Sequence, residues 1–436
     1  MSFLPNELLQ HTFAYFAVSD GGTNNQQDAK ALASICLASW RLYRIAQPLL
    51  YGTIQLDIRS NKLDILLHTL KKRRELTATI KELYLECGPD FPARVQWMYR
   101  VRRFLQDLLP ALTRLSVLKS NHRVCTTKLV ELALYKQGNG YHMNAPSDLS
   151  NLHTLELFAS DYVYKYNYIL RLPRLRRVCL YSAKLVDVDN EDAVLPNDWG
   201  WTSPSIKELV FRSPHRVWSA PGSLRLRSNS LQALSRSLPR LESLRYEHFE
   251  TVLNPWQCRA LATFFAPQLA GNLRRLELRD GRLDASRVKL RTGVIQIPDM
   301  SVIDKIQSSN LDYLSLDWHT LVLEAVDAGP VDGLPPVSSP LKTLRHLTFR
   351  YAEANAEKLP PWIPESVLEH VQWRFPALEK IDLELKLRER ADNALLQRYV
   401  KVFRSAGIEL EVLEHNPSTR NTGSITCPGR PSTLSP

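Results

Sequence analysis

The sequence predicts an α/β fold, in which a small three-helix segment precedes a long array of helix–strand units. The strands of this array are expected to be parallel on its concave side, with helices on the convex side. Three observations support the prediction: ten copies of a short apolar motif, helix-like stretches that end at a proline before some copies, and three amphipathic stretches within residues 1–51. We therefore expect three parts, which span residues 1–55, 56–414 and 415–436.

The recurring motif has the form L-x-x-L-x-L, with other aliphatic or aromatic residues at the apolar positions. Its ten copies begin at residues 80, 112, 152, 175, 206, 241, 273, 311, 344 and 378. The second half of each copy alternates apolar and polar residues, which is the periodicity of a strand. One copy is weak evidence, because any amphipathic strand can produce it, whereas ten in succession indicate a stacked array.

Helix-like stretches precede some of the predicted strands. Residues 231–238 and 367–375 have helical spacing of apolar residues, and Pro239 and Pro376 follow them. Proline ends a helix and favours extended backbone before it. Residues 408–412 alternate in the same way and predict a closing strand. Loops are predicted at residues 137–148, 187–198 and 327–340, and the polar tail at 415–436 is predicted to be disordered.

This pattern resembles the leucine-rich repeat family in its irregular, long-unit form, over roughly residues 56–414. The alternative is a series of unrelated α/β units whose strands happen to be rich in leucine. Unequal spacing between motif starts, from 23 to 40 residues, favours that alternative. Insertions between the units explain the same spacing.

Composition excludes several classes of protein. The net charge is +11, from 56 basic and 45 acidic residues, which permits anionic partners but does not demonstrate one. The six cysteines form no C-x-x-C pair, and no signal peptide or membrane-spanning run is present. The sequence thus predicts an intracellular protein without a membrane segment. It contains none of the common nucleophile, zinc or phosphate-binding motifs, so we predict no catalytic residue, metal or cofactor.

Three short helices are predicted at the N-terminus, over residues 3–16, 29–40 and 41–51. Pro5 suits the first turn of a helix, where its missing N–H costs nothing. A core made by about fifty residues is very small, so such a bundle gains stability from docking on another surface. Its apolar positions outnumber those that its own interior can bury, which predicts a face for a partner.

Two segments carry a resemblance to a second family. "LPNELLQHTFAYF" and "ALASICLASWRLYRIAQPLLYGTIQL" resemble an F-box, in particular the fungal form that ends in Ala-Gln-Pro-Leu-Leu-Tyr. The resemblance implies that these helices bind a Skp-type adaptor, which connects to a cullin–RING ubiquitin ligase. The contacts that it suggests are Leu4, Pro5, Leu8, Leu32, Ile35 and Trp40. Equally, some of these residues, especially Leu8 and Ile35, could pack inside the bundle.

An F-box joined to leucine-rich repeats implies a substrate receptor, whose repeat array holds a protein substrate. Residues that alternate with the apolar strand positions are expected to line the concave side. The predicted substrate contacts are Phe158, Tyr181, Arg212, Arg245, Arg279, Tyr313 and Arg350. Basic and acidic residues nearly balance on this side, which disfavours a simple phosphate- or nucleic-acid-binding surface. Two arginine pairs, Arg212 with Arg245 and Arg279 with Arg350, could hold an anion or be salt-bridged.

Two other functions remain open. The protein could be a repeat scaffold or inhibitor whose N-terminal helices only cap the array, because an uncapped array exposes its core. It could also bind nucleic acid through basic runs on predicted helices, at residues 71–75 and at Arg100, Arg102 and Arg103. Such runs are usually solvated helix faces, so nucleic acid is the less favoured partner.

Overall fold

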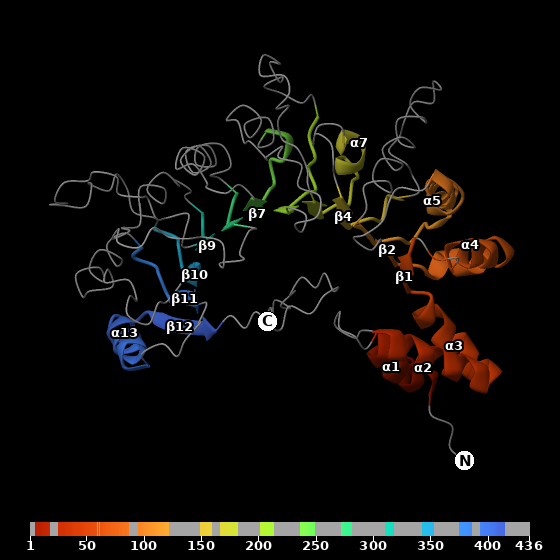
Figure 1. Cartoon of the computed structure of the whole chain (residues 1–436), viewed down its shortest axis with the longest axis horizontal. Coiled ribbons are helices and arrows are strands. Elements are labelled where there is room, and N and C mark those ends of the chain that lie inside the picture. The colour runs from red at the N-terminus through yellow and green to blue at the C-terminus, as the bar shows by residue number, and fades with distance from the viewer. Residues whose placement is uncertain are drawn as a thin grey trace. The chain divides into compact units, whose positions relative to one another are not determined.

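The structure is a computed structural model, and its elements are labelled in Figure 1. It describes residues 5–17, 25–58, 60, 62–86, 95–121, 149–158, 166–181, 201–212, 236–248, 272–280, 310–317, 342–352, 375–385 and 393–414. The chain divides into two compact units. Unit 1 comprises Met1–Ser120, Pro146–Leu152 and Pro417–Pro436, and unit 2 comprises Asn121–Ala145 and His153–Asn416.

Unit 1 begins with the three predicted helices, α1 (Asn6–Ala17), α2 (Asn25–Ala38) and α3 (Trp40–Leu50). Their core consists of Phe13, Leu32 and Ala46, one residue from each helix. Ser39 begins α3 as its N-cap, because its hydroxyl accepts a hydrogen bond from the Leu42 amide at 3.2 Å. A three-residue core is small, and partly buried apolar residues of all three helices surround it.

Three parallel strands follow in unit 1. The elements after α3 are β1 (Thr53–Asp57), α4 (Lys62–Lys72), the 3₁₀ turn η1 (Arg74–Thr79), β2 (Glu82–Glu86), α5 (Val95–Leu108), the 3₁₀ turn η2 (Leu109–Ala111) and β3 (Val117–Ser120). Ile54 of β1 pairs with Leu83 of β2, which pairs with Leu118 of β3. One strand, β1, therefore precedes the first predicted motif. The predicted boundary after residue 55 falls inside this strand.

The motif predicted to begin at Leu112 is displaced by three residues. The Leu115 amide donates to the Leu112 carbonyl at 3.0 Å, which places Leu112 in the turn before the strand. Leu118, rather than Leu115, pairs with Leu83. The apolar residues of this segment fit the motif in two ways, which differ by a shift of three residues. Because the 3₁₀ turn η2 ends at Ala111, the strand follows the later of the two.

Unit 2 contains nine strands among its described residues. The first eight begin at the third position of a motif, and the last begins at the second residue of the predicted closing strand. They are β4 (Thr154–Phe158), β5 (Arg177–Tyr181), β6 (Glu208–Arg212), β7 (Ser243–His248), β8 (Arg275–Asp280), β9 (Tyr313–Asp317), β10 (His346–Ala352), β11 (Lys380–Leu385) and β12 (Glu409–Glu414). They lie in chain order, and every pairing within the unit is parallel. The α/β class and the parallel, open sheet are thus confirmed.

The apolar motif positions make the core of unit 2. Successive members of one row are Leu155, Val178, Leu209, Leu244, Leu276 and Leu314, and each is 2% exposed or less. Burying one such side chain stabilises the fold by about 2 kcal/mol. The same alternation places the intervening residues on the opposite side of the sheet, as predicted.

Two kinds of hydrogen bond recur between successive motifs. The carbonyl at the second motif position accepts two consecutive amides of the next motif, as when Arg176 and Arg177 both donate to His153 at 2.9 Å. In addition, a polar side chain just before some motifs donates to a backbone carbonyl of an earlier turn. Asn272 bonds the Pro239 carbonyl at 2.8 Å and Thr343 bonds the Leu311 carbonyl at 2.8 Å. These bonds fix the turns at the amino ends of the strands.

The other predicted segments lie wholly or largely outside the described residues. These are the helices at 231–238 and 367–375, the three loops at 137–148, 187–198 and 327–340, and the tail at 415–436. Two further helices of unit 2 are described, α7 (Asn167–Leu170) and α13 (Asn393–Ser405). Over the described part of the chain, no helix combines the length and the apolar character needed to cross a bilayer.

Gly407 ends helix α13 in a left-handed conformation, with φ of 76°. The Ile408 amide donates to the Phe403 carbonyl at 2.9 Å and the Gly407 amide to the Arg404 carbonyl at 3.0 Å, which is a Schellman motif. A side chain is strained at such a φ. We expect Gly407→Ala to lower the free energy of unfolding by about 1 kcal/mol in urea titrations. An unchanged midpoint would contradict this assignment of the helix end.

Candidate functional site

The first candidate surface is an apolar patch on the helices of unit 1, formed by Pro5, Leu8, Leu37 and Trp40. Leu8 is 54% exposed, Leu37 88% and Trp40 73%, and Pro5 is exposed as well. Arg41 Nε donates to Asn6 Oδ1 at 2.9 Å, so the first turns of α1 and α3 lie side by side. Pro5, which directly precedes Asn6, therefore lies near the start of α3, where Trp40 lies, and Leu37 is three residues before Trp40 at the end of α2.

The six predicted adaptor contacts divide between surface and core. Pro5, Leu8 and Trp40 are exposed, whereas Leu32 is 3% exposed and belongs to the core of the bundle. Ile35 packs against that core and Leu4 lies outside the described residues. Leu32 is thus positioned to support the helices rather than to touch a partner.

Leu37 is the patch residue that the sequence prediction missed. Leu32, Ile35 and Cys36 follow helical i, i+3, i+4 spacing and face the core together. Leu37 comes five residues after Leu32, which turns it by about 140° around the helix. That departure from the apolar stripe was a readable signal that Leu37 faces away from the core.

The Trp40 side chain is held in place although it is exposed. Its ring stacks on Tyr43, with centroids 5.1 Å apart and planes 15° from parallel. The Tyr43 hydroxyl accepts a hydrogen bond from Arg73 Nη1, which lies between α4 and η1. An anchor that is already ordered loses less conformational entropy when it binds a partner.

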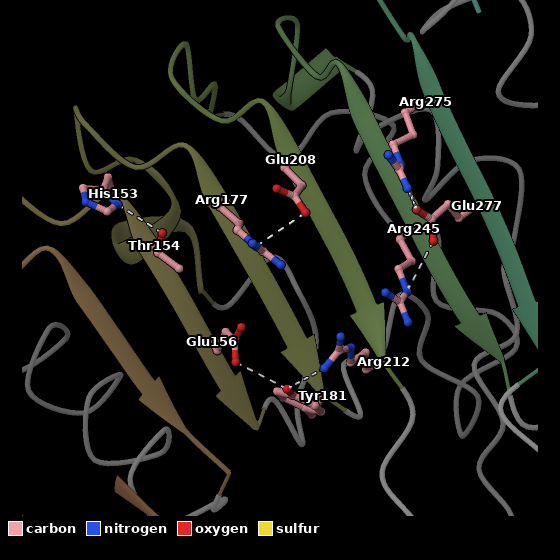
Figure 2. A network of polar contacts seen from close by, with 10 residues as sticks. All are labelled: His153, Thr154, Glu156, Arg177, Tyr181, Glu208, Arg212, Arg245, Arg275 and Glu277. Atoms are coloured by element: carbon pink, nitrogen blue, oxygen red, sulfur yellow. Dashed lines mark hydrogen bonds and ion pairs between the residues drawn. The ribbon is translucent and has the colours of Figure 1, made fainter. Parts of the chain in front are cut away.

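The second candidate surface is the polar face of unit 2, defined as the side of β4–β12 whose residues alternate with the buried leucine row. Figure 2 shows its part from β4 to β8. Phe158, Tyr181 and Arg212 are direct register partners on β4, β5 and β6, and all three are half-buried. The structure thus brings three of the seven predicted substrate contacts into one row.

Tyr181 links its two neighbouring strands on the polar face (Figure 2). Its hydroxyl donates to Glu156 at 3.4 Å and accepts from Arg212 Nη1 at 3.1 Å. The Arg212 guanidinium carbon also lies 5.7 Å from the centre of the Tyr181 ring. Burial raises the pKa of Tyr181 above its ordinary value, so the phenol stays protonated and remains a donor.

Arg245 belongs to a different network from Arg212. Its Nε lies 3.7 Å from Glu277, whose other oxygen accepts a hydrogen bond from Arg275 Nε at 2.7 Å. The Arg275 guanidinium in turn lies 4.0 Å from the centre of the Tyr313 ring. One carboxylate therefore faces two guanidinium groups, and the predicted contacts Arg245 and Tyr313 join the same cluster.

Three rows of residues run across the polar face: the first contains Arg177 and Arg275, the middle row Glu156, Cys179 and Glu277, and the third Tyr181 and Arg212. The middle row is covered by its neighbours. Glu156 is 2% exposed, Cys179 0% and Glu277 4%. Tyr181 reaches over the middle row to Glu156, and Arg275 reaches over it to Glu277. A partner can therefore reach the first and third rows, and Arg245, in the middle row, is 18% exposed.

The two members of each predicted arginine pair lie on different strands. Arg245 pairs in register with Val210, so Arg212 lies two residues further along its strand. Arg279 and Arg350 lie on β8 and β10 with β9 between them, and their side chains are outside the described residues. Neither pair is formed by directly opposed residues, because register depends on the apolar rows and not on the charges.

A third network joins β10, β11 and β12. Asp382 interacts with His346 Nε2 at 2.6 Å and with Lys380 Nζ at 3.1 Å, and Lys380 also contacts Glu411. Burial alone would raise the pKa of Asp382. Hydrogen bonds and charge from His346 and Lys380 more than offset this effect, so the pKa lies below its ordinary value.

A lowered folded-state pKa predicts the pH dependence of this network. The contribution of Asp382 to stability is complete above the unfolded-state pKa near 3.9 and is lost as pH falls through the lower folded-state value. We expect Asp382→Asn to lower the free energy of unfolding by about 2 kcal/mol at pH 7. The difference from the unsubstituted protein should shrink below about pH 4. Urea titrations from pH 7 to pH 2 measure it, and a constant difference would contradict the assignment.

The basic runs of unit 1 are partly neutralised. Asp107 lies 2.6 Å from Lys71 Nζ and 3.7 Å from Arg103 Nε, and Arg73 Nε donates to Glu75 at 2.9 Å. Arg100 and Arg102 lie on α5, as predicted, but their side chains are outside the described residues. Acidic partners within the run weaken the case for a phosphate-backbone contact here.

The complete chain matches no protein-family model, and comparison with curated proteins gives no significant match. The resemblances to an F-box and to leucine-rich repeats therefore depend on the sequence motifs of the chain.

Proposed function

We propose that the protein is the substrate-recognition subunit of a Skp–cullin–F-box ubiquitin ligase. The apolar patch of Pro5, Leu8, Leu37 and Trp40 binds the Skp-type adaptor, and the polar face of the repeat array binds a protein substrate. The observation that carries the proposal is the exposure of Leu37 and Trp40 on a bundle whose core is already filled. Clustered large apolar side chains in water are typical of protein interfaces, and aromatic anchors dominate their energy.

In this role the protein catalyses no bond change itself. The adaptor connects the patch to a cullin–RING ligase, and the repeat array brings a substrate lysine close to the ubiquitin-charged enzyme. The gain is in effective concentration, which depends on how the two binding surfaces are connected. Such a receptor acts inside the cell, where the ligase operates.

The polar face suits a substrate with polar side chains. Its arginines already interact with Glu208, Glu277 or Tyr181, so a bound segment must offer comparable partners to the groups that it covers. Phe158 and Tyr181 add half-buried aromatic area in the same row. We therefore expect specificity from matched polar groups rather than from net charge.

A scaffold with a helical cap is the second candidate, and one observation favours it. Helix α3 contacts η1, and Arg73 from that region bonds Tyr43 of α3, so the helices do pack on the first strand units. Capping and adaptor binding use different residues, because Leu37 and Trp40 remain exposed after this packing. Adaptor binding therefore distinguishes the two functions.

The test is binding of a purified Skp-type adaptor to the immobilised full chain, with and without a cullin N-terminal fragment. The proposal expects a 1:1 complex with micromolar affinity or better and recruitment of the cullin fragment only through the adaptor. The scaffold function expects no complex at any adaptor concentration tested. Absence of a complex with a folded chain would therefore overturn the ligase assignment.

A further inference from the structure

A polar groove lies in unit 2, beside the amino ends of β6–β10, away from the residues predicted to bind substrate. Its volume is about 790 Å³. The charged residues that line it are Lys207, Arg240, Glu242, Arg274, Asp312 and Arg345. We name it the amino-edge groove.

The charges along this groove alternate in sign. Lys207, Glu242, Arg274, Asp312 and Arg345 each occupy the second motif position, directly before the strand. Because the strands are paired in register, these five residues form one row across five neighbouring strands. Neighbouring strands are about 4.8 Å apart, so the three cations of the row recur about every 10 Å.

Among the described residues that line the groove, four are cations and two are carboxylates. Lys207 already forms an ion pair, because its Nζ lies 2.6 Å from Glu242. Arg345 Nε is 3.8 Å from Glu379, and both side chains are about two-thirds exposed, which makes a weak pair. Within the described part of the chain, the guanidinium groups of Arg240 and Arg274 are exposed and form no ion pair or hydrogen bond.

The backbone beneath these side chains is well fixed. The amides of Asp312 and Tyr313 both donate to the Arg274 carbonyl, at 2.9 and 3.0 Å. Asn272, which also lines the groove, bonds the Pro239 carbonyl next to Arg240. Arg240 and Arg274 are therefore presented from ordered turns, which favours a binding site over two independently moving surface charges.

We propose that the amino-edge groove binds an extended, acidic protein segment with carboxylates three residues apart. A segment in the polyproline II conformation has three residues per turn and rises about 3.1 Å per residue, so every third side chain lies on one side at a spacing of about 9 Å, close to that of Lys207, Arg274 and Arg345. The uncharged residues between successive carboxylates lie nearest Glu242 and Asp312. Pairing with carboxylates supplies charge-assisted hydrogen bonds to Arg274 and Arg240, whose guanidinium groups form none with the described residues.

Nucleic acid fits this groove less well. A phosphate backbone would meet Glu242 and Asp312 as well as the cations, and like charges in contact disfavour binding. Among the described residues that line the groove, none is an aromatic residue on which a base could stack. The alternating row therefore favours a peptide, whose side chains can alternate too.

The inference adds a second contact for the substrate of the proposed ligase receptor, outside the polar face, and depends on the proposed function in that respect. Peptide binding to the groove needs no adaptor. If the peptide binds and the adaptor does not, the ligase assignment alone fails. If the adaptor binds and the peptide does not, the groove assignment alone fails.

The experiment uses fluorescence anisotropy with the full chain and a fluorescein-labelled peptide that has glutamate at every third position among serine and alanine. The matched peptide has glutamine at those positions, and a single-stranded DNA of similar length is the third probe. Arg240→Ala/Arg274→Ala is the test variant, and Arg404→Ala, an exposed arginine on α13, is the control. Circular dichroism melts confirm that both variants fold.

We expect the glutamate peptide to bind more tightly than the glutamine peptide. The double variant should weaken glutamate-peptide binding about tenfold or more, whereas Arg404→Ala should leave it unchanged. Equal affinity of the double variant and the unsubstituted chain would overturn the proposal, as would no binding of the glutamate peptide at low salt. Tighter binding of the DNA than of the peptide, lost in the double variant, would assign the groove to nucleic acid instead.

Discussion

Leu37→Glu combined with Trp40→Ala is expected to abolish binding of the Skp-type adaptor to the full chain. The two side chains are 88% and 73% exposed, so neither supplies much stability to the bundle. At an interface, truncation of a central anchor typically costs about 2–4 kcal/mol, and a buried glutamate adds the cost of desolvating its charge. The sum corresponds to a loss of affinity of at least about a thousandfold.

Calorimetry or biolayer interferometry with purified adaptor measures this loss, and thermal unfolding verifies the fold. The matched control is Ile65→Glu combined with Tyr99→Ala, which changes exposed apolar residues of α4 and α5 in the same unit. This control should bind the adaptor as the unsubstituted chain does. If both double variants bind equally well, the apolar patch is not the adaptor site.

A buried residue of the same bundle should behave in the opposite way. Leu32 is 3% exposed, so Leu32→Ala removes core packing and is expected to cost about 2–5 kcal/mol of unfolding free energy. Leu32→Ala should reduce adaptor binding only in proportion to the fraction of molecules whose three-helix bundle is unfolded. The contrast between Leu32 and Leu37 separates contact with the partner from support of the helices.

Glu277→Gln is expected to lower the free energy of unfolding by about 3 kcal/mol. The Glu277 side chain is 6% exposed, and its carboxylate faces the guanidinium groups of Arg245 and Arg275. Loss of its charge removes the opposite charge that Glu277 supplies to Arg245, whose side chain is 18% exposed. Urea titrations followed by circular dichroism measure the change, and amide hydrogen exchange in β7 and β8 should report where it occurs.

Glu242→Gln is the matched control for this prediction. Glu242 is also paired with one cation, since it lies 2.6 Å from Lys207, but the two side chains are 43% and 50% exposed. Exposed pairs contribute about 0–1 kcal/mol, so this substitution should have little effect on stability. Equal destabilisation by Glu277→Gln and Glu242→Gln would show that burial does not determine how much these ion pairs contribute to the free energy of unfolding.

Alternation in the sequence was sufficient to predict most strands. Leu155, Leu209 and Leu244 are buried on one side because an apolar residue at every second position can occupy only one side of a sheet. The same rule aligned the rows, since a slip by one residue would turn each apolar side chain to the opposite side. It was ambiguous only where two apolar series overlap, at Leu112 and Leu115 before β3.

Spacing alone could not predict which apolar residues of the helices stay exposed. Leu8 and Ile35 both belong to apolar stripes, yet Leu8 is 54% exposed and Ile35 packs against the core. The outcome depends on which helix lies opposite each residue, and that is decided when α1, α2 and α3 pack together. Only Leu37 could have been recognised, from its position off the α2 stripe.

The sequence by itself thus determined the α/β class, the strands and the side of the sheet that each motif buries, because these follow from local periodicity. Tertiary structure alone decided that Glu277 serves both Arg245 and Arg275, and that Arg240 and Arg274 line one groove. Arg245 and Glu277 are about thirty positions apart in the chain, as are Arg240 and Arg274, and stacking of the repeats brings each pair together. Polar pairing between strands carries no periodic signal, so it becomes visible only when the register is known.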